Sequence, residues 1–146
     1  MSKADTWENG VLLMLFNNTP FTLVGDAGGL LASAVAGNLY VSLHDADPGE
    51  AGDQSTDEVD YTNYVRKAVA RSGAGWVVTD NAVNPADPIT FATGGSGTSP
   101  TATYFGIGSS SVGAGKLLYS GAITPGIICG EGITPVLTTD TEVTES

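Results

Sequence analysis

Apolar and polar residues alternate most clearly just before residue 45. Leu39, Val41 and Leu43 take every second position and polar or aromatic residues lie between them, which is the period-2 pattern of a β-strand with one buried face. The pattern ends at Asp47-Pro48-Gly49, a turn sequence, because proline fixes φ and glycine supplies a positive φ. Residues 50–60 follow with five carboxylates and few apolar side chains. The sequence therefore predicts a core strand that leads directly into a long acidic loop.

A second apolar pattern, with helical spacing, lies near the N-terminus. Asp5 and Glu8 have the spacing of a capping box, and Pro20 ends the pattern because the residue before a proline is pushed out of the α region. We expect an amphipathic helix over residues 5–16 that covers an open end of a sheet or packs on a neighbouring subunit. Its apolar stripe has the spacing i, i+4, i+7 and i+8 and consists of Trp7, Val11, Met14 and Leu15.

Short strand patterns recur along the rest of the chain, separated by residues that favour turns and loops. With no helical pattern between most of them, they predict an all-β fold, a β-sandwich or jelly-roll-like single domain with a short N-terminal helix. In this division residues 1–20 are the helix and arm, 21–138 the sandwich, and 139–146 an acidic tail that is disordered in solution. The expected strands are residues 21–24, 63–72, 76–79, 89–91, 103–107, 116–123 and 132–138, with a loop over 81–87.

Composition supports the all-β prediction and argues against some classes of binding partner. The chain has 146 residues, 20 glycines and only five basic residues, a balance that suits sheets more than helices. Its net charge of −11 argues against a nucleic-acid partner, since phosphates require clustered Lys and Arg. The longest apolar run, residues 11–16, is too short for a membrane span, and no signal peptide pattern opens the chain. We expect a soluble protein made in a cytoplasm.

Candidate reactive groups are few. His44 beside Asp45 is the only acid–base pair that involves a histidine, and no Gly-x-Ser-x-Gly elbow accompanies it, so we expect His44 to be a surface residue. The single cysteine, Cys129, lies in an apolar run and is expected to be a buried thiol. The glycine-rich residues 106–116 fail the nucleotide-binding patterns. The sequence predicts no catalytic residue, no metal ligand set and no cofactor.

The acidic loop and the basic residues each leave two interpretations open. The loop fails the EF-hand spacing; a plain solvated loop is favoured over a calcium or magnesium site of another kind. Arg66, Lys67 and Arg71 hold three of the five positive charges within six residues. They form either a solvated strand face that neutralises the loop or a contact strip for an acidic patch on another copy, and the two interpretations weigh equally.

Several motifs in a fixed order resemble those of small virion proteins of tailed bacteriophages, a group often labelled tail fibre proteins. The resemblance spans residues 5–138, and residues 17–38 are longer than the group's pattern. It implies a non-enzymatic structural protein with no catalytic residue. The motifs are the strand and acidic loop of residues 39–52, Tyr64-Val-Arg-Lys-Ala-Val69 followed by Trp76, Ile89-Thr-Phe91, Tyr104-Phe-Gly-Ile-Gly108, and residues 116–123.

The sequence thus predicts a virion component that assembles with itself, with a trimer favoured, and with other virion proteins. A decoration, collar or tail-associated part is expected rather than a long fibre, because no repeat is present. The helix stripe, the three clustered basic residues and the tail are the predicted contacts. The alternative is a module that binds host-surface glycans through Trp76 and Tyr61, whose rings would stack on sugars.

Overall fold

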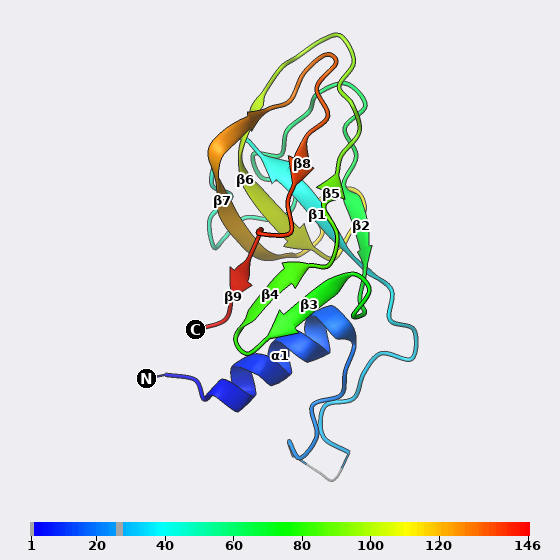
Figure 1. The fold of residues 1–146 in the computed structure, drawn as a ribbon, viewed down its shortest axis with the longest axis vertical. Helices are drawn as coiled ribbons and strands as arrows, with labels where there is room; N and C mark the ends of the chain where they lie inside the picture. The colour runs from blue at the N-terminus through cyan, green and yellow to red at the C-terminus, as the bar shows by residue number, and fades with distance from the viewer. Residues whose placement is uncertain (1, 26–27) are drawn as a thin grey trace. The chain divides into compact units, whose positions relative to one another are not determined.

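The computed structural model describes residues 2–25 and 28–146. This part of the chain has one helix and nine strands (Figure 1), so the predicted all-β class with an N-terminal helix is confirmed. The elements are α1 (Asp5–Asn17), β1 (Asn38–His44), β2 (Lys67–Ala70), β3 (Trp76–Thr79), β4 (Ala82–Pro85), β5 (Ile89–Thr90), β6 (Thr101–Gly108), β7 (Leu117–Ile128), β8 (Val136–Leu137) and β9 (Val143–Thr144).

The chain forms two compact units, each built from more than one segment of the sequence. The helix unit joins the residues up to Asn38 with Val69–Pro88 and Thr138–Ser146, and the sheet unit joins Leu39–Ala68 with Ile89–Leu137. Neither unit is a continuous stretch of sequence, so the units are not two domains joined by one linker.

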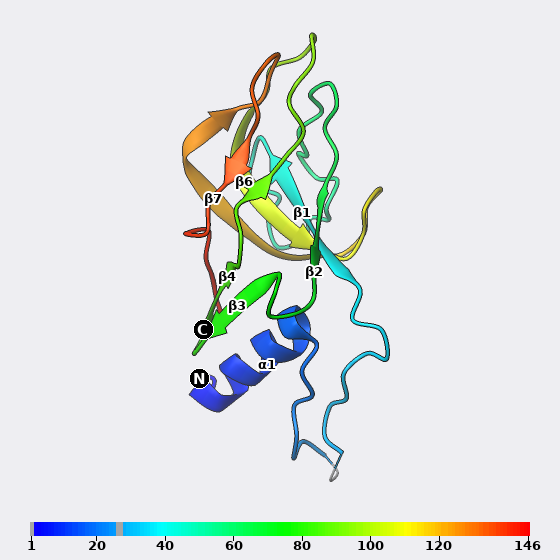
Figure 2. The same ribbon diagram turned by 45° about the vertical axis from the view of Figure 1, so that its right-hand side comes forward.

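In the helix unit, α1 contacts β3 and β4, which pair with each other in an antiparallel hairpin (Figure 2). The residues of α1 that are buried are Glu8, Leu12 and Phe16, at spacing i, i+4 and i+8. The Phe16 ring meets the ring of Trp76 edge-on, with the centroids 4.9 Å apart. The helix therefore has the predicted extent. Its buried residues, however, each follow one position after a residue of the predicted stripe: Trp7, Val11 and Leu15.

The predicted capping box is also wrong. Ala4 occupies the N-cap position and no side chain caps the helix there. Asp5 lies inside the first turn, where its charge, like that of Glu8, still faces the positive end of the helix dipole.

Two sequence predictions in this unit are wrong because a hairpin and the tail complete a sheet. Residues 82–85, expected to be loop, form β4, and Asp80 makes the preceding turn with φ of 53°. The tail, expected to be disordered, supplies β9, which pairs antiparallel with β4 in the order β3-β4-β9. Val143 is buried in this pairing, and that burial offsets the entropy lost by the short polar tail.

The sheet unit is built on β1. This strand pairs antiparallel with β6 from Tyr40↔Gly108 to His44↔Tyr104, within a sheet of order β2-β1-β6-β7. The residues from Val41 to His44 are all buried. The prediction of a single buried face is therefore wrong for the second half of β1, because the acidic loop folds back over its other face.

Residues 19–25 and 28–36, which we call the arm, contain no regular strand. The strand expected at residues 21–24 is only an isolated bridge between Phe21 and Leu30. The remaining expected strands are present. Strands β6 and β7 are longer than predicted, whereas β2, β5 and β8 are shorter, and the first four residues of the strand expected at 63–72 lie outside β2.

Candidate functional site

His44 is a buried structural residue. Its Nδ1 lies 2.7 Å from the carbonyl oxygen of Thr56 and its Nε2 lies 2.8 Å from Oγ of Ser42. A carbonyl can only accept, so Nδ1 donates to Thr56, and in that neutral tautomer Nε2 accepts a hydrogen bond from the Ser42 hydroxyl. Both side chains have no exposed surface, so no substrate reaches this Ser–His pair. The predicted surface position of His44 is wrong because the acidic loop covers it.

The acidic loop is held in place by one buried amide. The Gln54 side chain accepts a hydrogen bond from the Ser110 backbone N–H at 2.8 Å and donates to the Tyr40 carbonyl at 3.3 Å. Its backbone N–H donates to the Ala114 carbonyl at 2.8 Å. Gly108 lies against this side chain, and a Cβ there would come within 2.1 Å of Gln54 Cδ. The loop is thus a packed element of the sheet unit.

The carboxylates of this loop have separate local roles. Asp53 accepts hydrogen bonds from the Ser55 hydroxyl at 2.6 Å and the Ser55 backbone N–H at 2.8 Å, and these bonds lower the pKa of Asp53. Asp47 accepts from the Gly49 N–H at 2.9 Å. Across residues 2–25 and 28–146, no three His, Cys, Asp or Glu side chains are grouped as a metal ligand set.

Arg66 lies in a buried ion pair instead of on an exposed strip. Its side chain is 3% exposed and forms two parallel hydrogen bonds to Glu58, from Nε at 2.7 Å and from Nη2 at 2.6 Å. The remaining donors reach the carbonyls of Ser110 at 3.0 Å and Gly113 at 2.7 Å. The guanidinium therefore joins the acidic loop to residues 109–116 and has little surface left for a partner.

Tyr64 extends this network into β1. Its hydroxyl donates to Glu58 Oε1 at 2.8 Å and accepts from the Leu43 backbone N–H at 3.0 Å. Burial, followed by the nearby Glu58 charge, raises the pKa of Tyr64. Its phenol therefore remains a neutral hydrogen-bond donor across the physiological range.

Arg71 has an equivalent structural role in the helix unit. Its Nε donates to the Leu15 carbonyl at 2.6 Å and its Nη2 to the Met14 carbonyl at 2.8 Å. Its Nη1 donates to the carbonyl of Ala36 at 3.0 Å. The guanidinium thus satisfies carbonyls in the last turn of α1, which has no basic residue of its own there. The third clustered cation, Lys67, is half-buried and makes no ion pair with another described residue.

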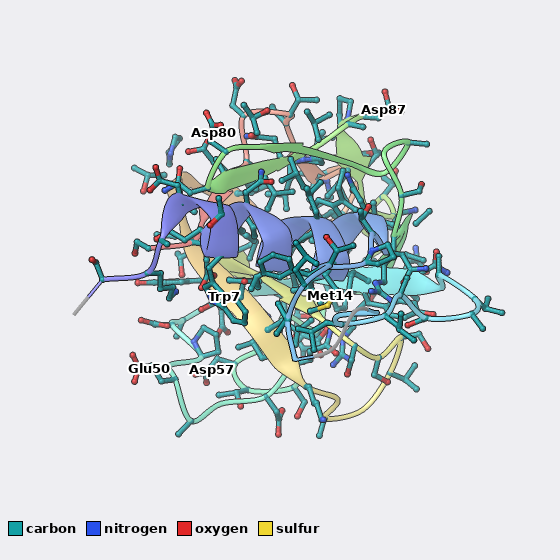
Figure 3. The ribbon with its side chains drawn as sticks, turned by 90° about the horizontal axis from the view of Figure 1, so that it is seen from below. Trp7, Met14, Glu50, Asp57, Asp80 and Asp87 are labelled. Carbon is teal, nitrogen blue, oxygen red and sulfur yellow. The ribbon has the colours of Figure 1, made fainter. Side chains whose placement is uncertain are left out.

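The predicted helix stripe remains accessible. Trp7 is 40% exposed, and Val11, Met14 and Leu15 are only partly buried. Trp7 and Met14 lie along the same side of α1 (Figure 3). The Trp7 ring contacts Phe21 of the arm, with centroids 5.4 Å apart. The arm thus covers part of the stripe, and the rest of its surface is accessible to solvent.

The aromatic residues assigned to glycan binding are both buried. Trp76 and Tyr61 are each 2% exposed, and the Tyr61 hydroxyl donates to the Ala92 carbonyl at 2.9 Å. Neither ring has a face for a sugar to stack on, because the core of its own unit covers it. Cys129 is buried as expected, and burial raises the pKa of its thiol.

Sequence reasoning missed Glu58, Tyr64 and Gln54 as structural residues. Their side chains lie beside distant segments, and nothing in local spacing connects them. The spacing of Tyr64 and Arg66 gave one clue, because alternate residues of an extended segment share a side.

Comparison with families of known proteins gives one match, to a family described as Podophage GP4 fiber I protein gp80, over residues 2–139. The chain belongs to this family. The match confirms the resemblance to tailed-phage virion proteins, and makes the chain a structural component of a tailed bacteriophage. The gp80 family is one of fibre proteins and not of enzymes. No curated protein matches the chain.

Membrane insertion through a helix finds no support in the described residues. None of their helices has both the length and the apolar character that crossing a bilayer requires.

Proposed function

We propose that the chain is a non-enzymatic, tail-associated subunit of a phage particle, made in the host cytoplasm and assembled as a homo-oligomer, with a trimer favoured. The fibre description of its family supports an association with the tail over a place on the head. The absence of an internal repeat supports a small component over a long fibre.

One observation carries the non-enzymatic part of the proposal. The side chains that could take part in catalysis have structural roles inside the protein. His44 and Cys129 are fully buried, and Arg66 is paired with Glu58. An active site needs such groups to converge on a cavity that substrate can enter. In the described residues these groups brace loops and strands, which suits a part that must stay rigid.

The contact surface is proposed on the helix unit. The stripe of Trp7, Val11, Met14 and Leu15 presents partly exposed apolar surface, and burial of such surface is the main driving force for association. Lys67, which belongs to the sheet unit, is a separate proposed contact, since its ammonium makes no ion pair with another described residue and the protein is otherwise strongly acidic. Exposed charge contacts add little affinity but guide orientation.

Quantitative mass spectrometry of purified particles tests this proposal. We expect the chain in every preparation, at a copy number that is a fixed multiple of three relative to a known head protein. Particles that lack the chain, while infected cells contain it, would contradict a structural role.

A further inference from the structure

The arm exposes an unusual amount of apolar side chain. Leu23, Val35 and Leu31 are 85%, 82% and 75% exposed, which makes them three of the four most exposed large apolar residues in the described chain. Isolated exposed apolar residues are common on soluble proteins. Three within one short segment instead mark a contact surface.

The arm is also fixed in position. Phe21 and Leu30 exchange two backbone hydrogen bonds of 2.9 Å. Nearer its base, Asn18 makes two hydrogen bonds of 2.9 Å with the backbone of Ser33. The arm therefore has a defined backbone, and the exposure of its apolar side chains does not come from an absence of structure.

The helix extends this surface. The Phe21 ring lies against Gly10, where a Cβ would come within 2.6 Å of the ring, and it also contacts Trp7. This contact requires a residue without a side chain at position 10. Phe21 therefore joins the arm to the accessible stripe of α1.

We propose that the arm is the surface through which a neighbouring copy of this chain binds. The proposal rests on the proposed function, since a subunit that assembles with itself needs a surface on which two copies can bind each other. Each copy carries a net charge of −11, so the approach of two copies through their charged surfaces is repulsive. Between Asn9 and His44 the sequence has a single charged residue, Asp26, so the stretch that contains the arm has a low density of charge.

The exposed area favours a neighbouring copy as well. Leu23, Leu31, Val35, Trp7 and Leu30 together expose on the order of 500 Å², summed over the five residues. Each partner contributes about 800 Å² to a standard interface. The arm with the helix stripe therefore supplies most of what one copy needs.

A matched pair of substitutions tests the arm. Val35→Glu adds a charge at an 82% exposed valine of the arm, and Val112→Glu adds the same charge at a 76% exposed valine of the sheet unit. Light scattering during gel filtration, over a wide concentration range, gives the mass of each variant relative to the 14.8 kDa chain. We expect Val35→Glu to raise the dissociation constant more than about tenfold, and Val112→Glu to behave like wild type.

The outcomes separate this proposal from the proposed function. Circular dichroism verifies that each variant is folded, and Leu31→Glu repeats the test at a second arm position. If both arm variants associate like wild type, or if the wild type stays monomeric throughout, the arm proposal is overturned. The copy number in particles then decides the structural role independently.

Discussion

Arg66 illustrates how the role of one residue depends on segments far away in sequence. In the sequence it is one of three clustered cations, and the spacing does not show which carboxylate of the acidic loop, if any, pairs with it. In the structure, Glu58 and the carbonyls of Ser110 and Gly113 take its hydrogen bonds. Removing one member of a buried pair leaves the other charge uncompensated, which costs more than the pair itself contributes.

Arg66→Ala is therefore expected to lower the free energy of unfolding by about 3–5 kcal/mol. The adjacent Lys67→Ala removes a cation that makes no ion pair with another described residue, and should change the free energy of unfolding by less than about 0.5 kcal/mol. Urea titration followed by tryptophan fluorescence measures both. Equal effects of the two substitutions would mean that the ion pair has no structural role.

Tyr61 gives a prediction about pH. Burial raises its pKa from 10.0 to about 12, so the unfolded chain loses the phenolic proton at lower pH than the folded chain. Stability is then complete below pH 10 and falls as the pH rises toward about 12. Tyr61→Phe, which cannot ionise, should lose less stability than wild type between about pH 9 and pH 11.5.

Burial also raises the pKa of Tyr64, so the Tyr61→Phe variant still loses part of its folding stability at alkaline pH. Parallel curves for the two proteins above pH 10 would show that Tyr61 ionises equally well in the folded and unfolded chains.

Helix α1 depends on a residue outside itself. Its last turn contains no basic side chain, and Arg71 supplies the missing donors to the carbonyls of Met14 and Leu15. A cation at this end also interacts favourably with the helix dipole.

Arg71→Ala should lower the free energy of unfolding by about 2 kcal/mol, since hydrogen bonds to charged groups contribute more than neutral ones. Arg71→Lys keeps the charge but loses the planar fork of donors, so we expect an intermediate loss. A lysine variant as stable as wild type would assign the effect to charge alone. Chemical denaturation followed by far-UV circular dichroism measures each.

Elements with a strong local pattern could be predicted, and those defined by partners could not. The helix and β1 carry clear periodicity, β3 and β6 are strand-forming residues bounded by turn residues, and the structure has all four at or near the expected positions. β4 contains Pro85, and β9 is two residues long in a polar tail. Each exists because it pairs with another segment, as Val83 of β4 pairs with the distant Val143 of β9. The strand propensity of a short segment does not indicate such a pairing.

At the scale of the whole molecule, the fold class and the family could be predicted, but the surfaces could not. Strand spacing and glycine content gave the all-β class, and the order of motifs gave the resemblance that the family match confirms. Exposure depends on which faces the chain itself covers. The prediction that Trp76 lies on a binding surface is therefore wrong, because Trp76 packs on Phe16, and no local pattern indicates that the leucines of the arm are exposed.

The central claim, that this chain is a structural part of a tailed-phage particle, is tested most directly by locating it on that particle. Antibody-labelled particles imaged by electron microscopy should carry the label at the tail in a constant number per particle. Particles that stay unlabelled, together with the chain recovered only as free protein in the lysate, would contradict the claim.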